Sequence, residues 1–186
     1  NPFGNVAVGY YGRNLDRHLR KLEIKEEPGQ KFDYISIGTQ ILGVIIEEAT
    51  GKTVSEYCEE KLWKPMGCEY DATWSLDRKK GREKAFCCLN ARARDYAKIG
   101  RLYMNLGNWE GEQLVPKDWV IQSSRVTKET KDPIYAYQWW HDRGPGIGEN
   151  GEINFFAQGH LGQFVYVSPN KQTIIIRIGK NYGNVN

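Results

Sequence analysis

The sequence predicts an α+β fold in which helices come first along the chain and antiparallel strands come last. Before about residue 133, apolar residues recur with helical spacing in several stretches. After that point, short runs rich in β-branched and aromatic residues alternate with Gly, Pro and Asn, as is typical of strands and turns. Segregated helices and strands indicate an α+β protein. We therefore expect a mainly helical region over residues 1–133 and antiparallel sheet strands over residues 134–186.

Composition supports a globular chain and excludes some partners. Of the 186 residues, 40% are hydrophobic and 12% aromatic, which is enough for a packed core. The net charge is only +3, with 26 basic and 23 acidic residues and no block of like charges, so we expect no nucleic acid partner. No apolar run reaches the roughly 18 residues of a membrane span. The compartment stays open between the cytoplasm and the periplasm or exterior.

Helices and strands can be placed from periodicity and from residues that favour helix ends. The first helix is expected to be buried along its recurring apolar positions, which are Ile37, Ile41, Leu42, Ile45, Ile46 and Ala49. The expected helices are 37–49 ending before Gly51, 53–63 opened by a capping box at Thr53 and Glu56, 92–106 capped by Asn90 and stopped by Gly107, and a short one after Pro116. The expected strands lie in YAYQWWH, INFFAQ, GQFVYVS and QTIIIRI.

The four cysteines do not form a pattern that binds a metal. They are Cys58, Cys68, Cys87 and Cys88, without a Cys-x-x-Cys pair and without histidine at metal-ligand spacing. We therefore expect no metal and no cofactor. Neighbouring cysteines rarely bond each other, so buried thiols are the preferred interpretation for all four.

Tyr34 and Ser36 stand where an extended stretch meets the first helix. A phenol held by backbone at such a joint is suited to proton transfer. Because an ordinary tyrosine has a pKa of about 10, a base of this kind needs a neighbouring cation such as a lysine. The alternative is that Tyr34, one of 11 tyrosines, only packs its ring.

A second unusual stretch is GHLGQ, residues 159–163, where two glycines interrupt a strand-like run. Glycine in a strand often marks the close approach of a ligand or another backbone. His160 could donate to a substrate, and the backbone amide of Gln163 could face an oxyanion. The alternative is a bulge that turns the strand, with His160 at the surface.

Together these stretches resemble the serine hydrolases of the class C β-lactamase and penicillin-binding type, with 6-aminohexanoate-dimer hydrolases and related esterases as the most similar group. The resemblance is carried by PGQKFDYISIGTQILGVIIEEATGKTVSEYCEEKLWKPMG, LNARARDYAKIGRLYMNLGNWEGEQLVP, YAYQWW and GHLGQFVYVSP, in the family's order. It implies a β-lactamase/transpeptidase-like fold and an amide or ester substrate cleaved through an acyl-enzyme.

The resemblance also implies roles for individual residues. Tyr34-Ile35-Ser36 matches the family's tyrosine motif, and His160-Leu161-Gly162 matches its strand motif in a histidine form. Tyr34 would then shuttle the proton, Ser36 would orient the site, and Gln163 would supply half of an oxyanion hole. His160 and Gly162 would line the substrate site.

The nucleophile motif Ser-x-x-Lys is expected to be absent from this polypeptide. Its single match is Ser168-Pro169-Asn170-Lys171, which reads as a hairpin turn, whereas the motif needs a helix so that both side chains share one face. The chain opens like the middle of a protein, so we expect an N-terminal part that is a second polypeptide or was removed after folding. The isolated chain would then be inactive.

Three interpretations of function remain open. The first is the C-terminal part of an acyl-transfer hydrolase, in which Trp139 and Trp140 wall the substrate cleft, unless this pair belongs to the core. The second is a non-catalytic binding or structural protein that retains the fold. The third is a D-stereospecific peptidase. Hydrolysis of simple esters or of D-alanyl peptides would discriminate among them.

Overall fold

The computed structural model describes residues 9–24, 26–27, 33–125, 134–142 and 153–181. They form two compact units, the first from the described residues up to 64 together with 71–90, and the second from residues 65–70 together with the described residues from 91 onward. This division does not fall at residue 133, because two helices of the expected helical region pack with the sheet. Among the described residues, none of the helices combines the length and the apolar character needed to cross a membrane.

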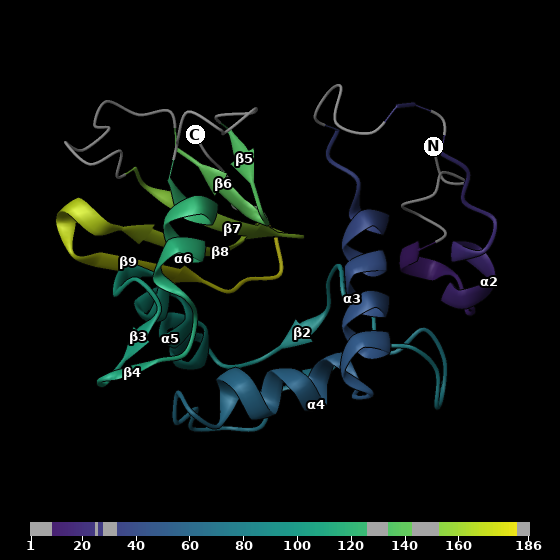
Figure 1. Cartoon of the computed structure of the whole chain (residues 1–186), viewed down its shortest axis with the longest axis horizontal. Helices are drawn as coiled ribbons and strands as arrows, with labels where there is room; N and C mark the ends of the chain where they lie inside the picture. The colour runs from purple at the N-terminus through teal and green to yellow at the C-terminus, as the bar shows by residue number, and fades with distance from the viewer. Residues whose placement is uncertain (1–8, 25, 28–32, 126–133, 143–152, 182–186) are drawn as a thin grey trace. The chain divides into compact units, whose positions relative to one another are not determined.

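The elements of the first unit are mainly helical (Figure 1). They are α2 (Leu15–Leu19), α3 (Ser36–Thr50), α4 (Val54–Cys58), the π-helix η1 (Glu59–Trp63), β1 (Thr73–Trp74) and β2 (Leu89–Asn90).

The second unit is built on a sheet. Its elements are α5 (Ala93–Met104), β3 (Asn108–Trp109), β4 (Glu112–Gln113), α6 (Lys117–Ser124), β5 (Tyr135–Ala136), β6 (Trp139–His141), β7 (Phe155–Gly159), β8 (Gln163–Ser168), the 3-10 helix η2 (Pro169–Lys171) and β9 (Thr173–Arg177).

The expected limits of α3 are confirmed, and so is the burial of Ile37, but the expected burial of Ile41, Leu42 and Ile45 is wrong. Gly51 ends the helix in a left-handed conformation, with φ 67°, and its N–H donates to the carbonyl of Glu47. The buried positions are Ile37, Gln40 and Gly43, whereas Ile41, Leu42 and Ile45 are 41%, 49% and 55% exposed. The apolar periodicity therefore marks a face that the described residues leave open.

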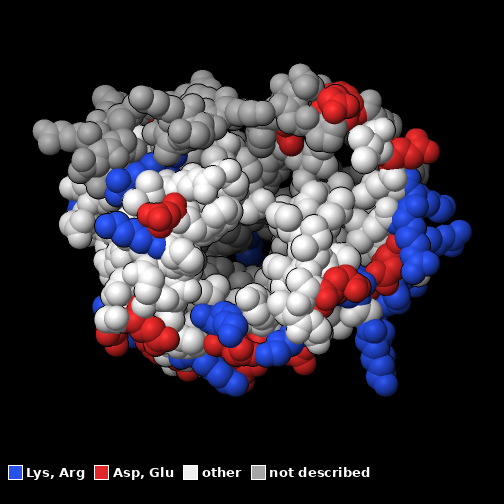
Figure 2. All heavy atoms as spheres, viewed as in Figure 1, with Lys and Arg blue, Asp and Glu red and all other residues white. Residues whose placement is uncertain are grey.

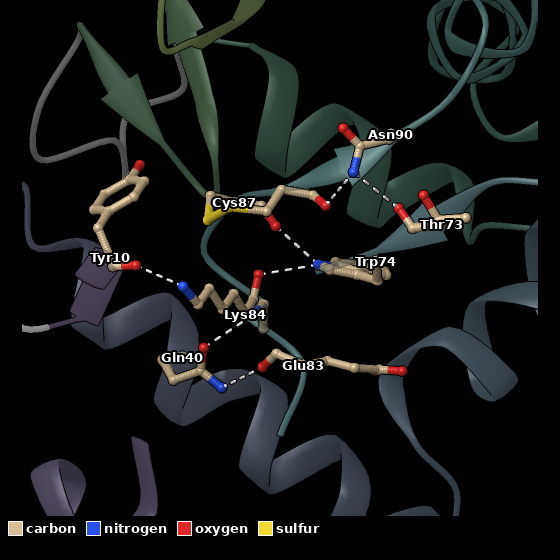
Figure 3. The surroundings of a disulfide bond; sticks show 10 residues. Tyr10, Gln40, Thr73, Trp74, Glu83, Lys84, Cys87 and Asn90 are labelled. Atoms are coloured by element: carbon tan, nitrogen blue, oxygen red, sulfur yellow. Dashed lines mark hydrogen bonds between the residues drawn. A yellow bond between two sulfur atoms is a disulfide. The ribbon is translucent and has the colours of Figure 1, made fainter. Parts of the chain in front are cut away.

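The reason for this orientation is a polar contact between α3 and the segment 83–88, which we call the clamp segment. The Gln40 side chain is 1% exposed. Its Nε2 donates to the carbonyl of Glu83 at 3.0 Å, and its Oε1 accepts from the N–H of Ala85 at 2.9 Å (Figure 3). A buried amide needs such partners, so it decides which face of α3 is covered.

The clamp segment also holds the start of α4. The buried carboxylate of Glu83 accepts from the N–H of Ser55 at 2.9 Å and from the Ser55 hydroxyl. The predicted capping box is confirmed, because Thr53 and Glu56 exchange side chain-to-backbone hydrogen bonds. Figure 2 shows basic and acidic side chains next to each other over α4 and η1, where exposed ion pairs such as Lys64–Glu59 (2.9 Å) form.

The expectation of four thiols is wrong for one pair. Cys87 and Cys88 form a disulfide, whereas Cys58 and Cys68 are thiols. Cys88 has a left-handed backbone, with φ 71°. No sequence pattern indicated this conformation, since such backbone usually belongs to glycine.

The second unit confirms the predicted strands and their antiparallel order. Its sheet has five strands in the order β5-β6-β7-β8-β9, a meander whose edges are β5 and β9 (Figure 1). The core contains Trp139, Phe155 and Val167, with partly buried neighbours on α5 and the strands. The predicted turn is also confirmed, because η2 joins β8 to β9 through the register pair Ser168 and Thr173.

Helix α5 packs on β8 and β9 through a glycine. A Cβ on Gly100 would lie 3.0 Å from Ile174 Cγ2 and 3.3 Å from Val167 Cγ2, so the helix backbone approaches the sheet closely. The expected cap by Asn90 is wrong. The N-cap of α5 is Arg92 without a side-chain bond, and Asn90 lies in β2, where its Nδ2 donates to the carbonyl of Cys88. The short helix after Pro116 is confirmed as α6.

Gly43→Ala should destabilise the chain, because the new Cβ would lie 2.6 Å from the Cβ of Ala85 in the clamp segment. We expect a loss of about 1–3 kcal/mol in the free energy of unfolding, as for other overpacked contacts. Gly38→Ala is the matched control in the same helix, since no atom lies within 4 Å of its added Cβ. It should be neutral or stabilise by about 0.5–1 kcal/mol. Urea unfolding of both variants tests the close contact, and equal midpoints would contradict it.

Candidate active site

Tyr34 lies at the surface, directly before α3. Its side chain is 51% exposed, so its ring is not in an apolar interior. The following residue, Ile35, is extended (φ −126°, ψ 106°) and is the N-cap of α3, and Ser36 is the first residue of the helix. Tyr34 and Ser36 thus stand where an extended backbone enters a helix, as expected. Pro28 and Gly29, two turn-forming residues that precede this joint, lie outside the described residues.

Two other tyrosines are poorly suited to accept a proton. Burial raises the pKa of Tyr96. Partial burial, together with a hydrogen bond of 2.9 Å to Asp142, raises the pKa of Tyr166 to about 12. Both phenols therefore hold their protons more firmly than an ordinary tyrosine does, which makes them poor candidates for a base.

The His160-Leu161-Gly162 motif forms the connection between β7 and β8. Gly159 and Gln163 are the last register pair of that hairpin, and Leu161 and Gly162 have positive φ values of 62° and 74°. The expectation that this motif lies on a strand is therefore wrong, because left-handed backbone ends the strand pairing. His160 is exposed and Gly162 is buried.

Arg177 and Gly179 hold this turn in place. The Arg177 guanidinium donates to the carbonyls of Gly162 and Leu161, the latter at 3.3 Å. The Gln163 side chain forms a reciprocal pair with the backbone of Gly179, whose N–H donates to Gln163 Oε1 at 2.9 Å. Sequence analysis missed both partners. The available clue was an arginine closing the apolar run TIII, where a charge needs a specific partner.

The two tryptophans of β6 differ in exposure. Trp139 is 6% exposed and packs edge-on against Phe155, with ring centroids 5.0 Å apart, so it belongs to the core. Trp140 is partly buried, and its ring contacts Tyr135. Core packing is the alternative that the sequence left open for this pair. A role in a substrate wall stays a prediction.

Ser168 is poorly placed to be a nucleophile. It ends β8 with 3% exposure, and Lys171 follows in η2 rather than on an α-helix. A substrate carbonyl could not reach a hydroxyl buried in this way. The described part of the chain also contains no group of three or more His, Cys, Asp or Glu side chains that could hold a metal ion.

The candidate residues fall into two groups. His160, Gly162 and Gln163 are neighbours at the β7–β8 turn of the second unit. Tyr34 and Ser36 belong to the first unit, at the start of α3. Each group has a backbone anchor of its own, which is Gln40 for α3 and Arg177 for the turn.

Comparisons with known proteins agree on one family. The family model described as Beta-lactamase matches residues 5–178. A 6-aminohexanoate-dimer hydrolase from Paenarthrobacter ureafaciens is 26% identical over 162 residues, which cover 80% of this chain and 39% of that protein. The chain therefore spans well under half the length of this relative.

Comparison with solved structures indicates the same family. One described as "Putative 6-aminohexanoate-dimer hydrolase from Bacillus anthracis" has a TM-score of 0.75 and 28% identity, covering 87% of this chain and 42% of that one. A second, described as a "putative beta-lactamase" from Bacteroides dorei, has a TM-score of 0.69 over 92% of this chain and 58% of that one. At 16% identity it supports the fold alone. The chain belongs to the beta-lactamase family.

Proposed function

We propose that this chain is part of a serine hydrolase that cleaves an amide or ester through an acyl-enzyme. The observation that carries the proposal is the exposed Tyr34 at the start of α3, in a member of the beta-lactamase family. Two of the similar proteins are described as 6-aminohexanoate-dimer hydrolases, which supports an amide as the bond that is cleaved.

In this proposal, Tyr34 transfers the proton. A serine hydroxyl attacks the substrate carbonyl while the Tyr34 phenolate takes the hydroxyl proton. The tetrahedral intermediate then expels the amine or alcohol, which receives the proton from Tyr34, and the acyl-serine remains. A water molecule attacks the acyl-serine, releases the acid and regenerates the serine. Ser36 would orient the groups around Tyr34.

The β7–β8 turn would bind the substrate oxygen. In this proposal the backbone amide of Gln163 donates to the oxyanion. His160 and Gly162 contact the substrate. Trp140, which is more exposed than Trp139, contacts it as well. Such a donor must stay within a few tenths of an ångström of its place. The hydrogen bonds from Arg177 to the turn carbonyls supply that constraint.

The nucleophile would come from outside these 186 residues. The single Ser-x-x-Lys match has a buried serine, and the chain corresponds to 39% of its Paenarthrobacter relative. We propose that the rest of the protein, in the same or a separate chain, supplies the motif. It would also cover the open apolar face of α3 and the β9 edge, where Ile175 is exposed.

Tyr34→Phe should lower kcat/KM for p-nitrophenyl butyrate and for the 6-aminohexanoate dimer by about 10²–10⁴-fold, the usual contribution of general acid–base catalysis. The assay uses the whole protein, and the 186-residue chain alone should give no turnover. Tyr11→Phe is the matched control, since Tyr11 is 85% exposed in the same unit.

Equal activity of the Tyr34 and Tyr11 variants would contradict the proposal. Cleavage of D-alanyl peptides in place of the two substrates would favour a peptidase. An inactive whole protein would favour a binding role.

Arg177→Ala should loosen the β7–β8 turn, because the carbonyls of Leu161 and Gly162 lose their charged donor. The loss corresponds to about 1.5–3 kcal/mol at most, reduced by the partial exposure of this side chain. Hydrogen exchange of peptides covering 159–164 should become faster, and kcat should fall more than KM rises. Arg101→Ala is the control, as its guanidinium lies over Trp109 away from the turn. Unchanged hydrogen exchange in the Arg177→Ala variant would contradict this prediction, because the turn would then keep its conformation without the Arg177 hydrogen bonds.

A further inference from the structure

The Cys87–Cys88 disulfide lies at the C-terminal end of the clamp segment, which makes two groups of hydrogen bonds (Figure 3). On one side, the backbone at Glu83 and Ala85 binds the Gln40 amide of α3. On the other side, the segment binds β1. Any change at the two sulfurs therefore acts on a segment that connects a helix with a strand.

The carbonyls of both cysteines accept hydrogen bonds from the β1 side. Trp74 Nε1 donates to the carbonyl of Cys87 at 2.8 Å and to that of Lys84 at 2.9 Å. The N–H of Ser75 donates to the carbonyl of Cys88 at 3.1 Å. These hydrogen bonds depend on the backbone conformation that the segment has with the disulfide formed.

The backbone at Cys88 would not keep this path easily by itself. Its φ of 71° lies in the left-handed region, which is unfavourable for a residue with a Cβ. A covalent ring through both sulfurs would hold Cys88 there. Opening the ring would let φ return to the right-handed side and turn the Cys88 carbonyl away from Ser75.

We propose that Cys87 and Cys88 form a reversible thiol–disulfide site whose oxidation state controls how firmly the clamp segment holds α3. With the disulfide closed, the segment bonds to both α3 and β1. With both thiols reduced, the bonds to Trp74 and Ser75 weaken first, and the Gln40 contact becomes the remaining anchor. Both cysteines are partly exposed, so a small reductant can reach them.

The exchange needs a dithiol as co-reactant. A thiolate of the dithiol attacks one sulfur of the pair, the bond between Cys87 and Cys88 breaks, and a mixed disulfide forms. The second thiolate of the reductant attacks that mixed disulfide and releases the protein sulfur. Two electrons pass to the protein, both cysteines take up protons, and the dithiol becomes a disulfide.

The other cysteines provide an internal comparison. Burial, and then the charge of Glu83, raise the pKa of the Cys58 thiol, which lowers its thiolate fraction and its reactivity. Adjacent thiols also stay close along the chain, so their bond can re-form once φ of Cys88 returns to the left-handed region. We therefore expect reversible chemistry at the pair rather than at Cys58.

The oxidation state can be read directly from a tryptic peptide. Cleavage after Lys84 and Arg92 gives the peptide 85–92, which contains Cys87 and Cys88 alone among the cysteines. After treatment with oxidised glutathione, this peptide should resist iodoacetamide and be lighter than the dithiol form by a pair of hydrogens. Dithiothreitol should make both cysteines alkylatable, and reoxidation should restore the first state. Alkylation of both residues after the oxidant would overturn the proposal.

Hydrogen exchange tests the effect on the clamp segment. Reduction should speed exchange of peptides covering 73–75 and 84–88 by roughly two- to tenfold, the effect of losing about one hydrogen bond. Peptides from α5 should not change. The Cys58→Ser/Cys68→Ser variant should respond like the parent, whereas Cys87→Ser should show fast exchange that dithiothreitol does not alter.

The Cys88→Gly variant separates the effect of the disulfide bond from the effect of the left-handed backbone at residue 88. Glycine tolerates the left-handed conformation, so this variant should keep slow exchange at Ser75 while losing the response to dithiothreitol. No change in exchange on reducing the parent would overturn the proposal. So would the loss of the response in the Cys58→Ser/Cys68→Ser variant.

Discussion

The buried side-chain amide of Gln40 is the contact on which the first unit depends. It bonds the backbone on both sides of Lys84 and so docks the clamp segment on α3. Leaving such a buried group unbonded costs about 1–3 kcal/mol, a large part of a domain's stability. Gly43 lies on the same face of the helix and lets Ala85 come close. A polar group and a missing side chain, together with the buried Ile37, thus fix the orientation of α3.

This orientation determines where Tyr34 can be. Tyr34 precedes the helix by two residues and has no regular structure of its own, so its position follows from that of the first turn of α3. The second unit uses the same device at the β7–β8 turn, where Arg177 bonds turn carbonyls from β9. In both units, a long polar side chain from a regular element binds the backbone of an irregular segment. Tyr34, Ser36 and the residues of the β7–β8 turn are held through these anchors, whereas Trp139 is held by core packing.

Sequence patterns predicted the features that depend on neighbours along the chain. The left-handed cap at Gly51, the capping box at Thr53 and the turn after Ser168 all follow from local chemistry. The contact of Gln40 with Glu83 joins residues 43 apart, and periodicity cannot reveal a buried polar partner at that distance. The sequence did not predict the disulfide for another reason. The bond occurs with a left-handed backbone at Cys88, a residue other than glycine.

The apolar face of α3 then has a physical interpretation. Ile41, Leu42 and Ile45 were expected to be buried, and the described residues leave them about half exposed. Covering the remaining surface of each would contribute about 1 kcal/mol. Under the proposal that the rest of a longer protein packs there, α3 is held by apolar burial on one face and by the clamp segment on the other. Loosening the clamp would then let α3 shift against its apolar support without unfolding it, so the disulfide would adjust the position of Tyr34 rather than the stability of the fold.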